Sequence, residues 1–116
     1  MHELSVTEQI LQIVLDHARK AKAKRVRRVN LVIGELTGFV AESVQFYFDM
    51  LSEETEAEKA SLSMTRVPAT ARCQKCKKEF HPGGSGSIDW FCPDCGGPVE
   101  EIVAGRECYV ESIEVE

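Results

Sequence analysis

The segment that decides the fold is residues 73–98, which read CQKCKKEFHPGGSGSIDWFCPDCGGP. It contains two C-x-x-C knuckles, Cys73-Gln-Lys-Cys76 and Cys92-Pro-Asp-Cys95, separated by the 15 residues from 77 to 91. This spacing is typical of a zinc site in which each knuckle turns two thiolates onto one ion. Four sulfur ligands favour zinc over nickel or copper(II). The sequence therefore predicts a zinc ribbon whose closed Cys₄ site is structural rather than hydrolytic.

The rest of this segment offers little material for a hydrophobic core. It holds five of the eight glycines and three of the four prolines of the chain. We therefore expect metal binding to supply its folding free energy. Gly96 and Gly97 are expected to form the tight turn after the second knuckle, and Trp90 and Phe91 to pack over the site. This motif has two alternatives to a zinc site. A rubredoxin-like iron site uses similar knuckles, whereas a thioredoxin-like redox site needs only one C-x-x-C knuckle.

The residues before the knuckles show two helical patterns. Apolar residues recur at three- and four-residue steps over 5–23, which predicts an amphipathic helix. Ser5 and Glu8 have the spacing of a capping box, so Ser5 is the expected N-cap. A second helix is expected over about 40–54, which holds three of the eight aromatic residues. This second helix is expected to contribute much of the core.

Alternating apolar residues predict strands at 26–36, at about 61–67 and within the last eight residues. The expected fold class is α+β, with two helices on a small mixed three-stranded sheet and an inserted zinc-ribbon domain. The expected α+β domain comprises residues 1–72 plus 99–116, and the expected zinc ribbon comprises residues 73–98.

The composition describes a soluble globular protein of 116 residues, because 43% of the residues are hydrophobic and 28% are charged. No apolar run approaches the roughly 20 residues that cross a bilayer. The first residues do not resemble a secretory signal, so we expect a cytoplasmic protein. The odd count of five cysteines also argues against a disulfide-stabilised secreted fold. Cys108, which lies outside the knuckles, is expected to be a small buried residue of a strand.

The charge is unevenly distributed. The net charge is −5, yet seven of the 14 lysines and arginines fall within residues 19–28. This basic stretch has three interpretations: a nucleic-acid contact surface, a docking site for an acidic partner protein, or a solvated helix end. The net acidity and the lack of interleaved aromatic residues argue against nucleic acid. We find no nucleophile–base pair, phosphate loop or open metal site, so we do not expect an enzyme.

The first residues offer a second kind of metal site. The Met1 amine, the His2 backbone nitrogen and the His2 imidazole can form fused chelate rings around one ion, and the Glu3 amide can complete a planar nitrogen set. Such ligation suits Ni(II) or Cu(II) rather than zinc, although a terminal histidine is more often solvated and inert. His81, between the knuckles, has three interpretations: a spare ligand, a pH-responsive neighbour of the zinc, or a plain loop histidine.

Three features occur together here: Met1-His2-Glu3-Leu4-Ser5, Ile33-Gly34-Glu35-Leu36, and the paired knuckles. With them the chain resembles, over essentially its whole length, the HypA/HybF family of nickel metallochaperones for [NiFe]-hydrogenase maturation. The resemblance implies that His2, Glu3 and Met1 bind Ni(II) as transported cargo. It also implies that a structural Zn(II) is bound by the paired cysteines, which are Cys73, Cys76, Cys92 and Cys95.

The resemblance further implies a role and partners. Members of this family bind nickel at the N-terminus and deliver it to the [NiFe]-hydrogenase large-subunit precursor with the GTPase HypB, and some also serve urease maturation. Neither nucleic acid nor a membrane is expected as a partner, and the chain is expected to be a monomer or a homodimer. The alternative function is that of a zinc-ribbon module that binds nucleic acid or another protein.

Overall fold

The computed structural model describes residues 3–82 and 90–116. The chain divides into two compact units. The first, here called the α+β unit, comprises Met1–Val32, Phe39–Thr65 and Cys108–Glu116. The second, here called the cysteine unit, comprises Ile33–Gly38 and Arg66–Glu107. The cysteine unit therefore extends beyond the residues 73–98 that the sequence suggested for the zinc ribbon.

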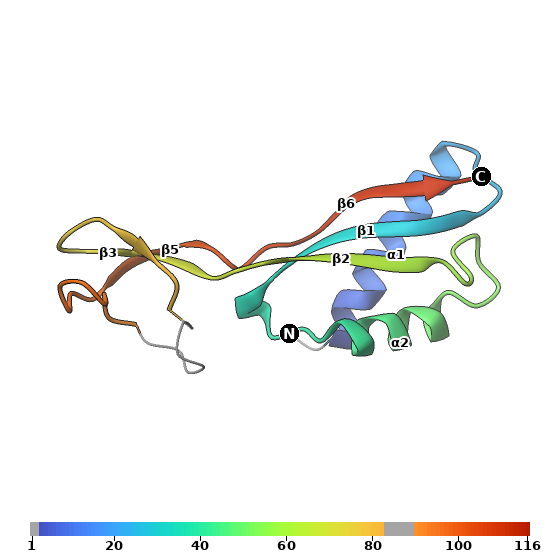
Figure 1. The fold of residues 1–116 in the computed structure, drawn as a ribbon. Coiled ribbons are helices and arrows are strands. Elements are labelled where there is room, and N and C mark those ends of the chain that lie inside the picture. The colour runs from blue at the N-terminus through green and yellow to red at the C-terminus, as the bar shows by residue number, and fades with distance from the viewer. Residues whose placement is uncertain (1–2, 83–89) are drawn as a thin grey trace. The chain divides into compact units, whose positions relative to one another are not determined.

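Two helices and a three-stranded sheet form the first part of the fold (Figure 1). The strand order is β2-β1-β6, in which β1 and β2 run in the same direction and β6 runs in the opposite direction. The mixed sheet with two helices confirms the predicted fold class. The elements are α1 (Glu3–Lys20), β1 (Val26–Gly34), the 3₁₀ turn η1 (Glu35–Thr37), α2 (Ala41–Leu51), β2 (Ser61–Val67) and β6 (Cys108–Val115).

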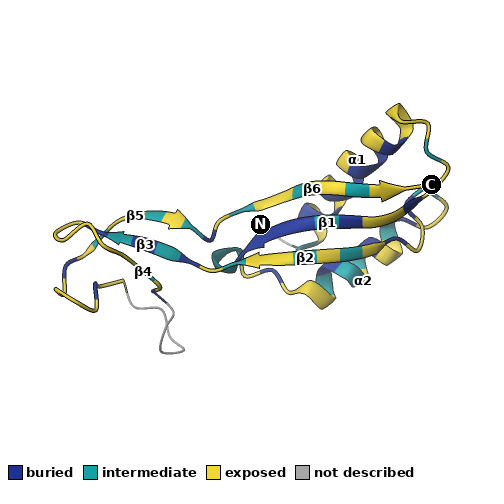
Figure 2. Cartoon of the chain, turned by 45° about the horizontal axis from the view of Figure 1, so that its top comes forward, coloured by how far each residue is buried: buried dark blue, intermediate teal, exposed yellow. Residues whose placement is uncertain are grey.

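The core of the α+β unit lies between the two helices and the central strand. Helix α1 buries one stripe, as its periodicity predicts, and α2 packs against it through Val44 and Phe48, which are fully buried. The central strand β1 is largely buried, whereas the two edge strands are mostly exposed (Figure 2). The buried stripe of α1 consists of Val6, Thr7, Ile10, Leu11, Val14, Leu15 and Ala18.

The two ends of α1 differ from the sequence prediction. The helix includes Glu3, so Ser5 lies in its first turn, exposed, and the prediction that Ser5 is the N-cap is wrong. The Glu3 carbonyl already accepts a hydrogen bond from the Thr7 hydroxyl at 2.6 Å. The helix ends at Lys20 rather than residue 23, because Lys22 adopts a left-handed φ of 55° and stops the helical repeat.

Helix α2 has no side-chain cap from its own first residues. Its N-cap residue is Val40, and no side-chain hydrogen bond of the usual local kind closes this end. Instead, the Glu3 carboxylate accepts a hydrogen bond from the Val40 backbone N–H at 2.7 Å. A carboxylate is favoured at a helix N-terminus by the helix dipole. The start of α1 is thereby joined to the start of α2.

The cysteine unit contains a second, antiparallel sheet with the order β4-β3-β5. Its strands are β3 (Thr70–Cys73), β4 (Glu79–Phe80) and β5 (Val99–Ala104). Arg72 on the central strand forms ion pairs with Glu79 and Glu101 on the two neighbouring strands. The first knuckle follows β3 directly, so this sheet fixes where the first cysteine lies.

Three backbone segments of the cysteine unit approach closely at Gly34, Ala69 and Gly105. A Cβ atom at Gly34 would lie 2.1 Å from the Gly105 carbonyl oxygen, and one at Gly105 would lie 2.8 Å from Ala69 Cα. Gly105 also has a φ of 115°, which favours glycine. The Leu36 N–H donates to the Gly105 carbonyl at 2.8 Å. Glycine at positions 34 and 105 therefore allows the three segments to approach this closely.

No helix within the described ranges combines the length and the apolar character that a membrane span requires.

Candidate metal centre

The four paired cysteines converge on one point. Their sulfur atoms all lie within 4.8 Å of one another, with 3.4 Å between the Cys73 and Cys95 sulfurs and 3.7 Å between those of Cys76 and Cys92. A disulfide would bring two sulfurs to about 2.0 Å, and all four thiols are free. A tetrahedral zinc with Zn–S bonds of 2.3 Å needs sulfurs about 3.8 Å apart. The cluster therefore fits a single tetrahedral ion.

The two knuckles are built as matching turns. The Lys77 N–H donates to the Cys73 carbonyl at 3.1 Å, and the Gly96 N–H donates to the Cys92 carbonyl at 2.9 Å. Both donors are left-handed, with φ values of 63° and 73°. The prediction that Gly96 forms a tight turn is confirmed, whereas Lys77 adopts the same conformation without the freedom of glycine.

Gly97 has a different role from its neighbour Gly96. It is buried, its φ is not left-handed, and a Cβ atom placed on it would lie 2.9 Å from the Cys73 sulfur. Its carbonyl accepts a hydrogen bond from the Cys92 N–H at 2.8 Å. The Gln74 N–H donates to the carbonyl of Pro98 at 2.9 Å. The second knuckle therefore approaches the first because residue 97 has no side chain.

The metal-free thiols differ in acidity. The pKa of Cys73 is lowered to about 6, chiefly because the Cys76 N–H donates to its sulfur. A hydrogen bond from the Lys78 N–H lowers the pKa of Cys76, but burial and the neighbouring sulfurs outweigh it and raise this pKa to about 11. Four thiolates would repel one another unless a cation lay between them. A bound divalent metal would deprotonate all four.

The two aromatic residues expected to cover the site are not buried. Trp90 is 42% exposed and Phe91 is 58% exposed, so neither contributes a fully buried side chain to this unit. Apart from Ile33, the buried hydrophobic residues among the described residues of this unit are small ones, namely Ala69, Ala71, Cys73, Pro82 and Cys92. Such small side chains bury too little apolar area to stabilise the unit by themselves. This supports the expectation that its folding depends on a metal.

Cys108 does not belong to the cluster. It begins β6 and is exposed, so the prediction of a buried strand residue is wrong. The reason is that β6 is an edge strand of the sheet, and most of its side chains are exposed.

His81 contacts a carboxylate rather than the cysteines. Its Nε2 lies 2.9 Å from Glu35 Oε1, and the same oxygen accepts the Ala69 N–H at 2.8 Å. The Ala69 hydrogen bond and then His81 hold the pKa of Glu35 below its ordinary value. Sequence reasoning assigned Glu35 no role, although it belongs to the segment Ile33-Gly34-Glu35-Leu36 that carries the family resemblance. The structure shows that Glu35 links the η1 turn to Ala69 and His81.

The N-terminal candidates are described only in part. Met1 and His2, predicted as nickel ligands, lie outside the described residues. Glu3 is described, and its carboxylate binds the Val40 N–H. It is the first residue of α1 that the structure describes.

The basic stretch at residues 19–28 is partly neutralised within the chain. Arg19 pairs with Glu56 at 2.9 Å, Arg27 with Glu116 at 3.5 Å, and Arg28 with Glu114 at 3.7 Å. These pairs are exposed and contribute little to stability. They favour the interpretation of a solvated surface for these three arginines.

Comparison with known proteins decides the family. A family model described as "Hydrogenase/urease nickel incorporation, metallochaperone, hypA" matches residues 1–115. This chain belongs to the HypA family. The resemblance found in the sequence is thereby confirmed, and the HypA family is one of maturation factors and metallochaperones rather than of catalysts.

Relatives and a solved structure agree with this assignment. A "Hydrogenase maturation factor HypA" from Dehalococcoides mccartyi is 46% identical over 116 residues, which cover all of this chain and 95% of that protein. The protein of the same name from Caldanaerobacter subterraneus is 46% identical over 117 residues and is matched over the full length of both chains. "Solution structure of HypA protein" has a TM-score of 0.70 at 27% identity, covering 100% of this chain and 97% of the other.

Proposed function

We propose that this HypA family member binds Ni(II) through Met1, His2 and Glu3 and delivers it for [NiFe]-hydrogenase maturation. A structural Zn(II) is bound by the four paired cysteines. The observation that carries the proposal is the four-sulfur cluster, in a family of nickel-incorporation proteins. A closed four-sulfur site suits a metal that stays, so the nickel in transit needs other ligands.

The cysteine cluster supports the choice of zinc. Its sulfur separations match a tetrahedral four-sulfur ion, and zinc accepts that geometry without an electronic preference. Four thiolates complete the coordination sphere, so no position remains for a substrate or for exchange. The bound zinc would fix the two knuckles against each other and would stabilise a unit whose buried side chains are mostly small.

The N-terminus supports the choice of nickel. The Met1 amine, the His2 amide and imidazole, and the Glu3 amide form a nitrogen set that suits square-planar Ni(II). Glu3 is in the first turn of α1, where backbone N–H groups have no partner within the helix. Its amide is therefore available to a metal without loss of a helical hydrogen bond. Protonation of the nitrogen ligands releases the ion, so nickel affinity falls as the pH falls.

Glu3 contributes to this site in two ways: its amide is a proposed nickel ligand, and its carboxylate positions the backbone. Its carboxylate is bound by the Val40 N–H at the start of α2, which fixes the first turn of α1. The nitrogen ligands then start from a defined backbone instead of a free chain end. This lowers the ordering entropy that metal binding must overcome.

Delivery requires the two sites to differ. The nickel site has to be exchangeable, so that a partner can take over its ligands one at a time. The expected partners are the GTPase HypB and the [NiFe]-hydrogenase large-subunit precursor, and urease maturation factors are further candidates, all in the cytoplasm. The proposed nickel-binding domain is residues 1–72 plus 99–116, and the proposed zinc ribbon is residues 73–98. The chain acts as a monomer or a homodimer.

Calorimetric Ni(II) titration of the zinc-loaded chain tests this function. His2→Ala and a variant with one added N-terminal residue should both lose high-affinity nickel binding and keep their zinc. His17→Ala is the matched control, because this exposed histidine lies on the same helix α1, and it should bind nickel as the wild type does. Undiminished nickel binding in both N-terminal variants would remove this site from the account.

A further inference from the structure

The outer edge of β2 is a surface that the metal sites do not use. In the sheet order β2-β1-β6, β2 is an end strand, so within the described residues no other strand pairs with this edge. An open groove of about 470 Å³, here called the first cavity, lies beside this edge and is lined by residues of β2 and α2. An unpaired edge beside a groove has the geometry by which an extended peptide joins a sheet.

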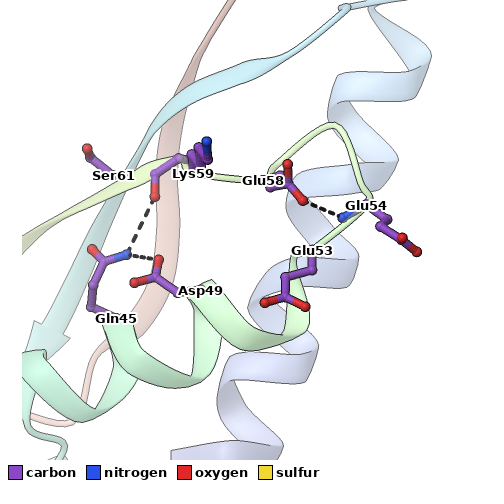
Figure 3. A pocket seen from close by; sticks show the side chains of 8 residues that line it. Gln45, Asp49, Glu53, Glu54, Glu58, Lys59 and Ser61 are labelled. Atoms are coloured by element: carbon purple, nitrogen blue, oxygen red, sulfur yellow. Dashed lines mark hydrogen bonds between the residues drawn. The ribbon is translucent and has the colours of Figure 1, made fainter.

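One side chain, that of Gln45, already makes strand-like hydrogen bonds at this edge. Gln45 Oε1 accepts the Leu62 N–H at 3.0 Å. Gln45 Nε2 donates to the Ala60 carbonyl oxygen at 3.5 Å, the bond that Figure 3 shows. The Leu62 backbone therefore points away from β1. Because backbone groups of alternate residues point to the same edge, we infer that the N–H and C=O of Met64 do so too. Gln45 occupies the start of the edge, so the backbone N–H and C=O of Met64 are the groups with which a partner strand would pair.

Three large apolar side chains are among the residues that line the groove beside this edge. Phe46 on α2 is 64% exposed, and Leu62 and Met64 on β2 are half-buried. Phe46 lies on a different face of α2 from Val44 and Phe48, which are in the core. An exposed phenylalanine next to two partly exposed apolar side chains favours contact with another apolar surface.

The surroundings of the groove are strongly acidic. A second cavity, of about 620 Å³, adjoins the first and shares Gln45 and Asp49 with it. Five acidic side chains and one basic side chain, Lys59, line the two cavities, the second of which Figure 3 shows. The acidic residues are Glu42, Asp49, Glu53, Glu54 and Glu58. This charge selects a basic partner and repels nucleic acid.

We propose that this surface docks an extended, basic segment of a partner protein. The segment adds a strand to β2 through the backbone groups of Met64, places an apolar side chain against Phe46, and directs lysine or arginine side chains toward the acidic rim. Backbone pairing supplies affinity, and alternate side chains supply specificity. The docking surface contains none of the proposed nickel ligands, so this proposal can be tested independently of the proposed function.

The test uses a synthetic eight-residue peptide of alternating valine and lysine, blocked at both ends. It is titrated into the full, zinc-loaded, ¹⁵N-labelled chain and followed by amide chemical shifts. Shifts should be confined to residues 41–50 and 61–65, and raised salt should weaken binding. Phe46→Ala should weaken it about tenfold. The matched control is Ile13→Ala, which removes an exposed apolar side chain from α1 and should leave peptide binding unchanged.

Two control peptides separate strand addition from charge attraction. A peptide with alternate backbone nitrogens methylated cannot pair with β2 and should not bind, and a valine–glutamate peptide should be repelled. Equal binding of the methylated peptide, or shifts spread over acidic residues elsewhere, would overturn the proposal. Self-association of the chain through the β2 edge would also overturn it, by making a second copy the occupant. Nickel binding by Phe46→Ala should match that of the wild type. A loss of peptide binding in this variant can therefore be distinguished from a failure of the proposed nickel site.

Discussion

Replacing Gly97 by alanine should loosen the metal centre without touching a ligand. The new Cβ would lie 2.9 Å from the Cys73 sulfur and 3.1 Å from Lys75 Cγ. Ordinary contact needs roughly 3.5–4.0 Å, so the sulfur would have to move by about 0.6 Å or more. Zinc sites tolerate only about 0.2 Å in their bond lengths. Overpacking of this kind costs about 1–3 kcal/mol, which corresponds to a loss of about 5- to 150-fold in zinc affinity.

Competition with a chromophoric chelator measures that loss, and cobalt substitution reports the geometry of the site. Gly96→Asn is the matched control, because nothing lies within 4 Å of a Cβ there and asparagine tolerates the left-handed φ of 73°. Gly96→Asn should keep near wild-type affinity and an unchanged cobalt spectrum, whereas Gly97→Ala should alter both. If Gly97→Ala binds zinc within twofold of wild type with an unchanged spectrum, the close approach of residue 97 to Cys73 does not organise the site.

Three further predictions concern stability. The Ala69 N–H and the adjacent His81 lower the pKa of Glu35 from 4.5, so the contribution of Glu35 to stability is complete above pH 4.5 and is lost as the pH falls through the lowered pKa. Glu35→Gln should therefore show a smaller drop in Tm between pH 7 and pH 3 than the wild type. An equal drop in both proteins would refute this. Gly34→Ala should cost about 3 kcal/mol in chemical denaturation because its Cβ meets backbone, whereas Gly38→Ala, with open space at a φ of 72°, should cost about 1 kcal/mol. Phe48→Ala, fully buried, should cost about 3–5 kcal/mol, and a cost below 1 kcal/mol would contradict the described core.

The sequence predicted those parts of the fold that depend on local pattern. The spacing of the two knuckles predicted that four cysteines share one site, because each knuckle is a self-contained turn. The alternation around Val29 and Leu31 predicted a strand, since every second residue of a strand with one buried face points to the core. Helix periodicity likewise predicted which face of α1 is buried.

The remainder depends on contacts between residues far apart in the chain. Ser5 has a cap-like spacing, but α1 already includes Glu3, and the cap that sequence reasoning missed joins Glu3 to Val40, 37 residues away. Trp90 suggested a cover for the metal site because of its size, whereas small residues and a close glycine approach build that site. The strand-like hydrogen bonds of Gln45 arise only once α2 lies beside β2.

Native mass spectrometry of the chain with both metals tests the central claim most directly. The account predicts one zinc that survives a mild chelator and one nickel per chain that the same chelator removes. Adding a residue before Met1 should abolish the nickel peak and leave the zinc peak. Two results would contradict the account by showing that the cysteine cluster carries the nickel. In the first, nickel displaces zinc. In the second, nickel is lost when Cys92→Ser removes a zinc ligand but is retained when the N-terminus is extended.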